Sequence, residues 1–178
     1  VAPSPRSYAT MAALNKSAVL LYGGVGPSPG FATLGDQWVF NTTTWAWSNV
    51  TSDADASAGT TPGMRGGHAM AAIDCLGTNK KMERGIVLFG GANEPPPASS
   101  GSTTWMYKKA KDETWTWTKV STVFKPPPLW GHAMTSFTDV KGGTKAFMAM
   151  GCRDQNCSVP AAEAYIFNAT KSKYTWTR

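Results

Sequence analysis

Five asparagines stand in Asn-x-Ser/Thr triplets, the acceptor pattern for N-linked glycans, and none of the five has proline in the middle. They are Asn15, Asn41, Asn49, Asn156 and Asn168. One triplet is a weak signal because these residue types are common, but five in 178 residues are several times the number expected by chance. The set therefore predicts an N-glycosylated protein that is secreted or displayed at the cell surface.

Two of these asparagines have a second interpretation. Asn41 and Asn168 directly follow Phe40 and Phe167, at a matching position before the last predicted strand of a repeat. Asparagine is common in turns because its side chain bonds its own backbone. Both interpretations stay open, and glycosylation is favoured for the set as a whole.

The acid–base residues are few and are placed symmetrically. His68 and His132 are each followed by Ala-Met, which favours packing, since a catalyst needs one base, one nucleophile and one orienting group. Asp36 and Glu163 each stand two residues before an aromatic residue, and we expect them to meet backbone or arginine within a sheet. A hydrolase with paired carboxylates is the alternative. No catalytic residue is assigned, and the chain is predicted not to be an enzyme.

The cysteines give one candidate disulfide. Cys152 and Cys157 have four residues between them, so a bond would close a small loop, although two unrelated thiols are the alternative. Cys75 is placed in a loop from Cys75 to Arg84, either as a buried free thiol or with a partner elsewhere. The sequence has no Cys-x-x-Cys and both histidines hold repeat positions, so neither a metal nor another cofactor is predicted.

These residues are distributed over copies of one pattern. Apolar runs that end in glycine occupy residues 19–24, 87–91 and, less regularly, 147–151. The next aromatic landmark, Trp38, Trp105 or Tyr165, follows the last glycine by 14 residues in every copy. Similarity at a fixed interval indicates a repeat fold.

Each copy predicts four short strands. A segment upstream of the glycine-ended run is the first (8–14, 67–73, 131–137), and the run itself is the second. The third reads aromatic-aliphatic-aromatic (38–40, 105–107, 165–167), and the fourth reads aromatic-x-Trp (45–47, 115–117, 174–176), with both aromatics on one face. Four antiparallel strands per unit are typical of a β-propeller blade.

The motifs resemble the Kelch repeat. The second copy matches best, with Pro62, Arg65, Gly67-His68-Ala69, Gly90-Gly91, Trp105, Tyr107 and Trp117. The first copy keeps Pro5-Arg6 but has Tyr8-Ala9 in place of Gly-His, and the third has Leu129 in place of arginine and Met150-Gly151 in place of the diglycine. The resemblance implies an all-β, Kelch-type propeller with blades at 1–51, 62–120 and 126–178.

Three blades do not close a ring, since propellers have roughly four to eight. Open faces lined with aromatics would be a large apolar patch. We therefore expect a segment of a larger propeller, or a ring completed by another chain, most simply as a pair of three-bladed copies. A linear fibre of stacked units is a second arrangement.

Composition fits this class. Apolar residues make up 42%, with 18 glycines, 12 prolines and eight tryptophans. The net charge is +6, but the basic residues form only small groups, interpreted as loop ends (Lys80, Lys81 and Arg84; Lys108, Lys109 and Lys111). Nucleic acid is not predicted as a partner, and neither is a membrane span. Val1 is interpreted as a mature or cut end.

The predicted function is non-catalytic binding or structural assembly, by contact with proteins, glycans or copies of itself in an extracellular matrix or fibril. Recognition is assigned to loops 25–35, 92–103 and 153–160, without individual binding residues. One alternative is an extracellular oxidase similar to galactose oxidase, or a hydrolase, with its active site outside this segment. Another is a cytoplasmic Kelch adaptor, which predicts free thiols and no glycans.

Overall fold

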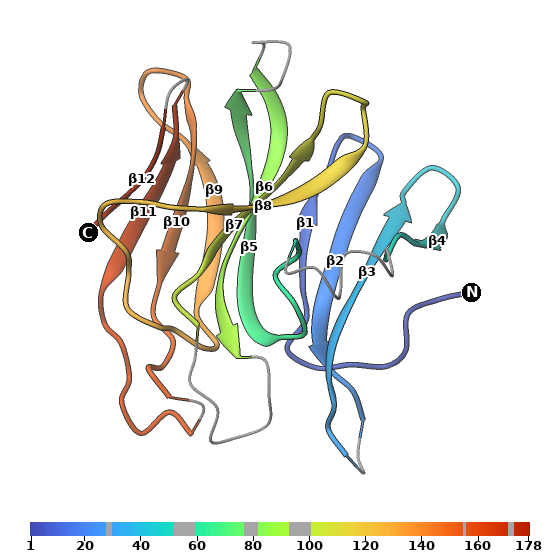
Figure 1. Ribbon diagram of the computed structural model, residues 1–178, viewed down its shortest axis with the longest axis horizontal. Coiled ribbons are helices and arrows are strands. Elements are labelled where there is room, and N and C mark those ends of the chain that lie inside the picture. The colour runs from blue at the N-terminus through green and yellow to red at the C-terminus, as the bar shows by residue number, and fades with distance from the viewer. Residues whose placement is uncertain (28–29, 52–59, 77–81, 93–100, 155, 171–172) are drawn as a thin grey trace.

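The computed structural model describes residues 1–27, 30–51, 60–76, 82–92, 101–154, 156–170 and 173–178. These residues form three four-stranded antiparallel sheets and no helix (Figure 1). The first sheet holds β1 (Thr10–Ala13), β2 (Ala18–Val25), β3 (Thr33–Asn41) and β4 (Ala46–Asn49). The second holds β5 (Gly66–Leu76), β6 (Met82–Ala92), β7 (Thr104–Lys109) and β8 (Trp115–Val120). The third holds β9 (Ala133–Thr138), β10 (Thr144–Ala149), β11 (Ala164–Ala169) and β12 (Tyr174–Thr177).

The strands pair in chain order within every sheet, and the repeat interval sets their register. The landmark aromatic of the third strand faces the equivalent residue of the second strand in all sheets: Leu21 pairs with Trp38, Leu88 with Trp105, and Met148 with Tyr165. The predicted repeat of four strands is therefore confirmed.

One aromatic of each third strand contacts both aromatics of the fourth-strand motif. The ring centroids lie 4.8–6.0 Å apart in these contacts. The groups are Phe40 with Trp45 and Trp47, Tyr107 with Trp115 and Trp117, and Phe167 with Tyr174 and Trp176. Trp45 departs from the prediction, because β4 begins at Ala46 and Trp45 lies before it at a φ of 57° and 81% exposed.

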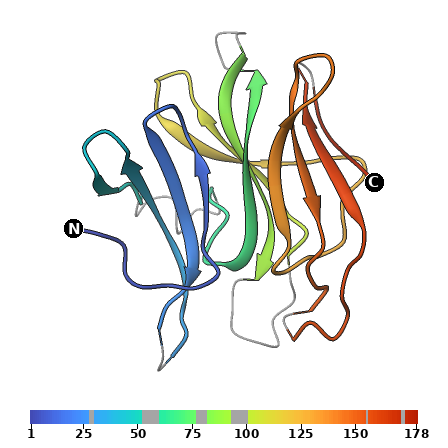
Figure 2. The same ribbon diagram turned by 180° about the vertical axis from the view of Figure 1, so that it is seen from behind.

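The sheets pack face to face in chain order, and both ribbon views show them as successive layers with the termini on opposite sides (Figures 1 and 2). One apolar cluster joins Leu20 and Tyr22 of the first sheet to Leu88, Trp105 and others of the second. The other cluster joins the opposite face of the second sheet to the third, with Val87, Phe89, Met106, Met148, Tyr165, Phe167 and Trp176 among its members. The second and third sheets thus present their third-strand aromatics to the sheet before them.

Close backbone approach explains the diglycines. The amide of Gly24 donates to the Arg65 carbonyl at 2.8 Å, and the equivalent amide of Gly91 donates to the Leu129 carbonyl at 3.0 Å. A Cβ added at Gly90 would lie 2.6 Å from the same Leu129 oxygen. The first glycine of each pair therefore leaves the space into which the next repeat's backbone enters.

Three expectations about loops were wrong. Cys75 lies in β5, fully buried, where it pairs with Glu83, because β5 and β6 extend further than the apolar pattern shows. Loop 25–35 is shorter than predicted, since Val25 ends β2 and Thr33 begins β3. The two basic groups are not confined to loops, because Arg84 belongs to β6, while Lys108 and Lys109 belong to β7.

Candidate functional site

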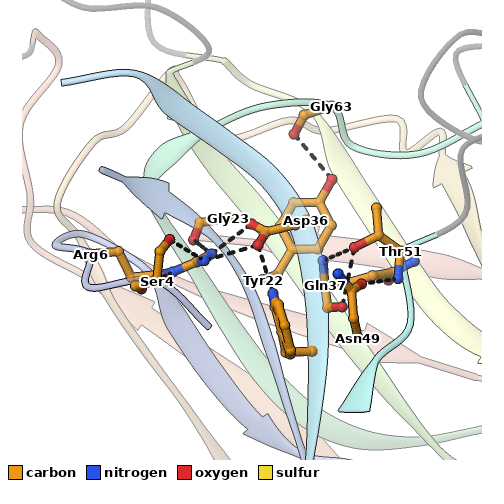
Figure 3. Close-up of polar contacts among 10 residues, drawn as sticks. Ser4, Arg6, Tyr22, Gly23, Asp36, Gln37, Asn49, Thr51 and Gly63 are labelled. Atoms are coloured by element: carbon orange, nitrogen blue, oxygen red, sulfur yellow. Dashed lines mark hydrogen bonds and ion pairs between the residues drawn. The ribbon is translucent and has the colours of Figure 1, made fainter. Parts of the chain in front are cut away.

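A polar network lies at the end of the first sheet near its glycine pair (Figure 3). The Arg6 guanidinium donates to both carboxylate oxygens of Asp36, at 2.6 and 2.9 Å, and to the Gly23 carbonyl at 3.0 Å. The indole Nε1 of Trp38 donates to the same carboxylate at 2.6 Å. Burial alone would raise the pKa of Asp36, but the bonds from Arg6 and Trp38 outweigh it and lower the pKa.

The third sheet contains a related ion pair. Arg153 and Glu163 are 2.5 Å apart, and Glu163 holds the repeat position of Asp36. Both acids thus form ion pairs with arginine, one of the two kinds of partner that the sequence predicted. The second sheet has Thr103 at this position instead.

The two histidines fill the space above the preceding glycine pair. His68 packs edge-on against Tyr22 at 5.7 Å, and His132 packs against the equivalent Phe89 at 5.8 Å. Both side chains are buried, at 2% and 5% exposure. Burial lowers the pKa of His132 to about 4, although the Phe89 carbonyl favours the charged ring. Packing is the role that the sequence predicted for them.

A pH dependence of stability follows from His132. Its folded-state pKa of about 4 lies below the ordinary 6.5, so unfolding takes up a proton between these values. Stability is complete above about pH 6.5 and is lost as the pH falls toward 4, by about 3 kcal/mol for this group. His132→Gln is expected to flatten the curve of urea-unfolding free energy against pH over this window. Parallel curves for the two proteins would contradict the assignment.

Hydrogen bonds between sheets repeat as well. Trp117 Nε1 donates to Gln37 Oε1 at 3.1 Å, and the equivalent Trp176 Nε1 donates to Thr104 Oγ1 at 2.9 Å. Gln37 and Thr104 share one repeat position, 13 residues after the glycine pair. Sequence reasoning missed this link, although matched polar residues within otherwise apolar third strands were a usable signal.

Two sheet faces have no sheet packed on them within the described part of the chain. The open face of the first sheet comprises Met11, Val19, Leu21, Trp38, Phe40 and Trp47, by alternation against the buried partners of β1 to β3. Leu21 and Trp38 lie at its buried centre, whereas Met11 is 59% exposed. The open face of the third sheet comprises Thr135, Phe137, Lys145, Phe147, Ile166 and the glycan acceptor Asn168, with Phe147 at 39% exposure.

The five glycan acceptors lie at turns, in a loop or near strand ends. Asn15, Asn41, Asn49 and Asn156 are exposed, and Asn168 is half-buried in β11. The Oδ1 atom of Asn41 accepts bonds from the amides of Thr43 and Thr44 at 2.8 and 3.1 Å. The turn interpretation thus holds for Asn41. These bonds use Oδ1, whereas a glycan is carried by Nδ2, so the two roles are compatible.

Cys152 and Cys157 form a disulfide with a Cα–Cα distance of 4.9 Å, and Asn156 lies within the loop that it closes. Cys75 is a buried free thiol, and burial raises its pKa. The described residues contain no cluster of three His, Cys, Asp or Glu side chains that could hold a metal. They also include no helix long and apolar enough to cross a membrane.

The three proposed recognition loops are described to different extents. Residues 153–160 form the loop around the disulfide, apart from 155. Phe31, at 56% exposure, is an exposed aromatic of the loop between β2 and β3. Residues 93–100, with the triple proline of the second loop, lie outside the described residues.

No protein-family model matches the chain, and no curated protein matches it. Among solved structures, it is similar to a chain in "Cryo-EM structure of RAG in complex with one melted RSS and one unmelted RSS", with a TM-score of 0.58 and 13% identity. The match covers 98% of this chain and 52% of that one, so this chain spans about half the length of its structural relative. At this identity the likeness shows the fold alone.

Proposed function

We propose that this chain is a Kelch-type β-propeller segment that is secreted, N-glycosylated and non-catalytic, and that acts by binding or assembly. The observation that supports this most is the direction of stacking, because the open aromatic face of the first sheet is the kind of face that the second and third sheets bury. A face so rich in apolar side chains marks an interaction surface.

The open faces favour a second copy of the chain as the occupant, with its first sheet on the third sheet of this one. This docking requires Asn49 and Asn168, which lie on the two faces, to carry no glycan. Met150 stands where the other sheets have glycine, and Ala9 stands where they have histidine. A histidine over Met150 would collide with it, whereas alanine leaves room. The third sheet also has Ala164 at the position of Gln37 and Thr104, so this contact would be apolar without the indole bond.

Three sheets matching about half of a longer chain are consistent with a ring of two such halves. If the ring is instead completed by further blades of the same chain, those blades would cover the same two open faces. In either case the edge loops remain exposed, and we assign recognition of a protein or glycan partner to loops 26–32 and 153–160.

Glycosylation is tested by intact mass. Protein secreted from a eukaryotic host is expected to lose mass in glycan-sized steps on treatment with an N-glycosidase. Thr43→Ala removes the acceptor triplet at Asn41 but keeps the backbone amide that bonds its Oδ1, so it should remove one glycan without unfolding the turn. The matched control Thr44→Ala keeps the triplet. No mass change at any of the five sites would refute the secreted assignment.

A further inference from the structure

The second sheet contains buried polar atoms that have no hydrogen-bond partner among the described residues. They include Nε of Arg65, Oγ1 of Thr103 and Nε1 of Trp105, together with both ring nitrogens of His68. Arg65 is 8% exposed and Trp105 is 6% exposed. Since a buried donor without a partner costs free energy, and a buried charge costs more, this group requires an explanation.

Arg65, Thr103 and Trp105 correspond one by one to the Arg6–Asp36–Trp38 network of the first sheet. Nη1 of Arg65 donates to the Gly90 carbonyl at 2.7 Å, as Nη1 of Arg6 donates to the equivalent Gly23 carbonyl at 3.0 Å. Trp105 and Trp38 share the landmark position, and Thr103 replaces Asp36. The guanidinium and the indole are therefore retained, and the carboxylate that they bind in the first sheet is replaced.

Threonine cannot act for the missing carboxylate. Its hydroxyl oxygen is attached to Cβ, one bond nearer the backbone than the oxygens of aspartate, and it carries no charge. Other hydrogen bonds hold part of the guanidinium, because Nη1 donates to the Gly90 carbonyl and Nη2 donates to the Pro62 carbonyl. What remains is a cationic edge, an indole N–H and a hydroxyl, all of which can donate to an acceptor.

From this replacement we infer that the Arg65–Thr103–Trp105 group binds a small monovalent anion of the halide type. The anion takes the charge position that Asp36 supplies in the first sheet. Donors of this kind bind anions through charge-assisted hydrogen bonds.

The test measures thermal unfolding of the full chain in sodium chloride or bromide against sodium gluconate at equal ionic strength. Chloride is expected to raise Tm by about 2–4 °C and to saturate, because it binds the folded state. Thr103→Asp should raise Tm by about 3–6 °C in gluconate and abolish the chloride response. Anomalous diffraction from a bromide-soaked crystal should place one ion beside Arg65.

The first sheet offers the reciprocal variant. Asp36→Thr reproduces the composition of the second-sheet group around Arg6, so this variant should gain a chloride response while losing stability in gluconate. An identical response to chloride and gluconate in the wild type, with no bromide peak, would mean that water occupies the site and would overturn the inference.

Discussion

Gly90→Ala is expected to lower the free energy of unfolding by about 3–4 kcal/mol, more than most single substitutions do. Two causes add at this position. Gly90 has a φ of 70°, which side chains with a Cβ rarely adopt, and the new Cβ would lie 2.6 Å from the Leu129 carbonyl oxygen and 2.8 Å from His132 Cε1. The Leu129 carbonyl accepts the bond from Gly91, so neither partner can retreat without loss. Urea unfolding followed by tryptophan fluorescence measures the change.

Gly142→Ala separates backbone strain from the clash. Gly142 has a φ of 78° in the turn between β9 and β10, with no neighbouring atom within 4 Å of an added Cβ. Its substitution should cost about 1 kcal/mol through φ alone. Equal losses for the two variants would show that the approach of the next repeat's backbone contributes nothing to stability.

The strand order and register can be predicted from the sequence, because the spacing between repeated residues determines which residues pair. A fixed interval of 14 residues from glycine to aromatic fixes which second-strand residue faces Trp38, Trp105 or Tyr165. The glycine pairs also mark a structural feature in the sequence, because the backbone of the next repeat approaches them too closely for a side chain. The packing role of the histidines could be predicted from their matching positions, although the preceding-sheet ring that each one contacts could not.

Features that depend on a partner far along the chain were not predictable. The sequence places Cys75 in a loop, yet β5 and β6 continue past it, with Asp74 paired to Arg84. Gln37 bonds Trp117 across a separation of 80 residues. The sequence shows that Thr103 stands where the first repeat has Asp36. The structure adds that Arg6 and Arg65 bond equivalent glycine carbonyls, so that Arg65 lacks the carboxylate that Arg6 binds.

Charged substitution on either open face is expected to weaken the proposed self-association of the chain by at least about 100-fold in Kd, since the charge would be buried against apolar side chains. Met11→Asp acts on the open face of the first sheet, and Phe147→Asp acts on that of the third. Val140→Asp is the matched control, because Val140 lies in the turn after β9 at 103% exposure, off both faces. Sedimentation velocity over a concentration series gives the dissociation constants.

Mixing the variants identifies which faces meet. If the first sheet of one copy docks on the third sheet of the other, a mixed dimer of Met11→Asp and Phe147→Asp has both charges at one interface and leaves the other interface unaltered. The mixture should therefore associate more tightly than either variant alone. Pairing of like faces predicts instead that one variant has no effect and that mixing restores nothing. A closed pair also stops at a dimer, whereas an open stack continues to grow with concentration, because head-to-tail contacts that do not close produce filaments.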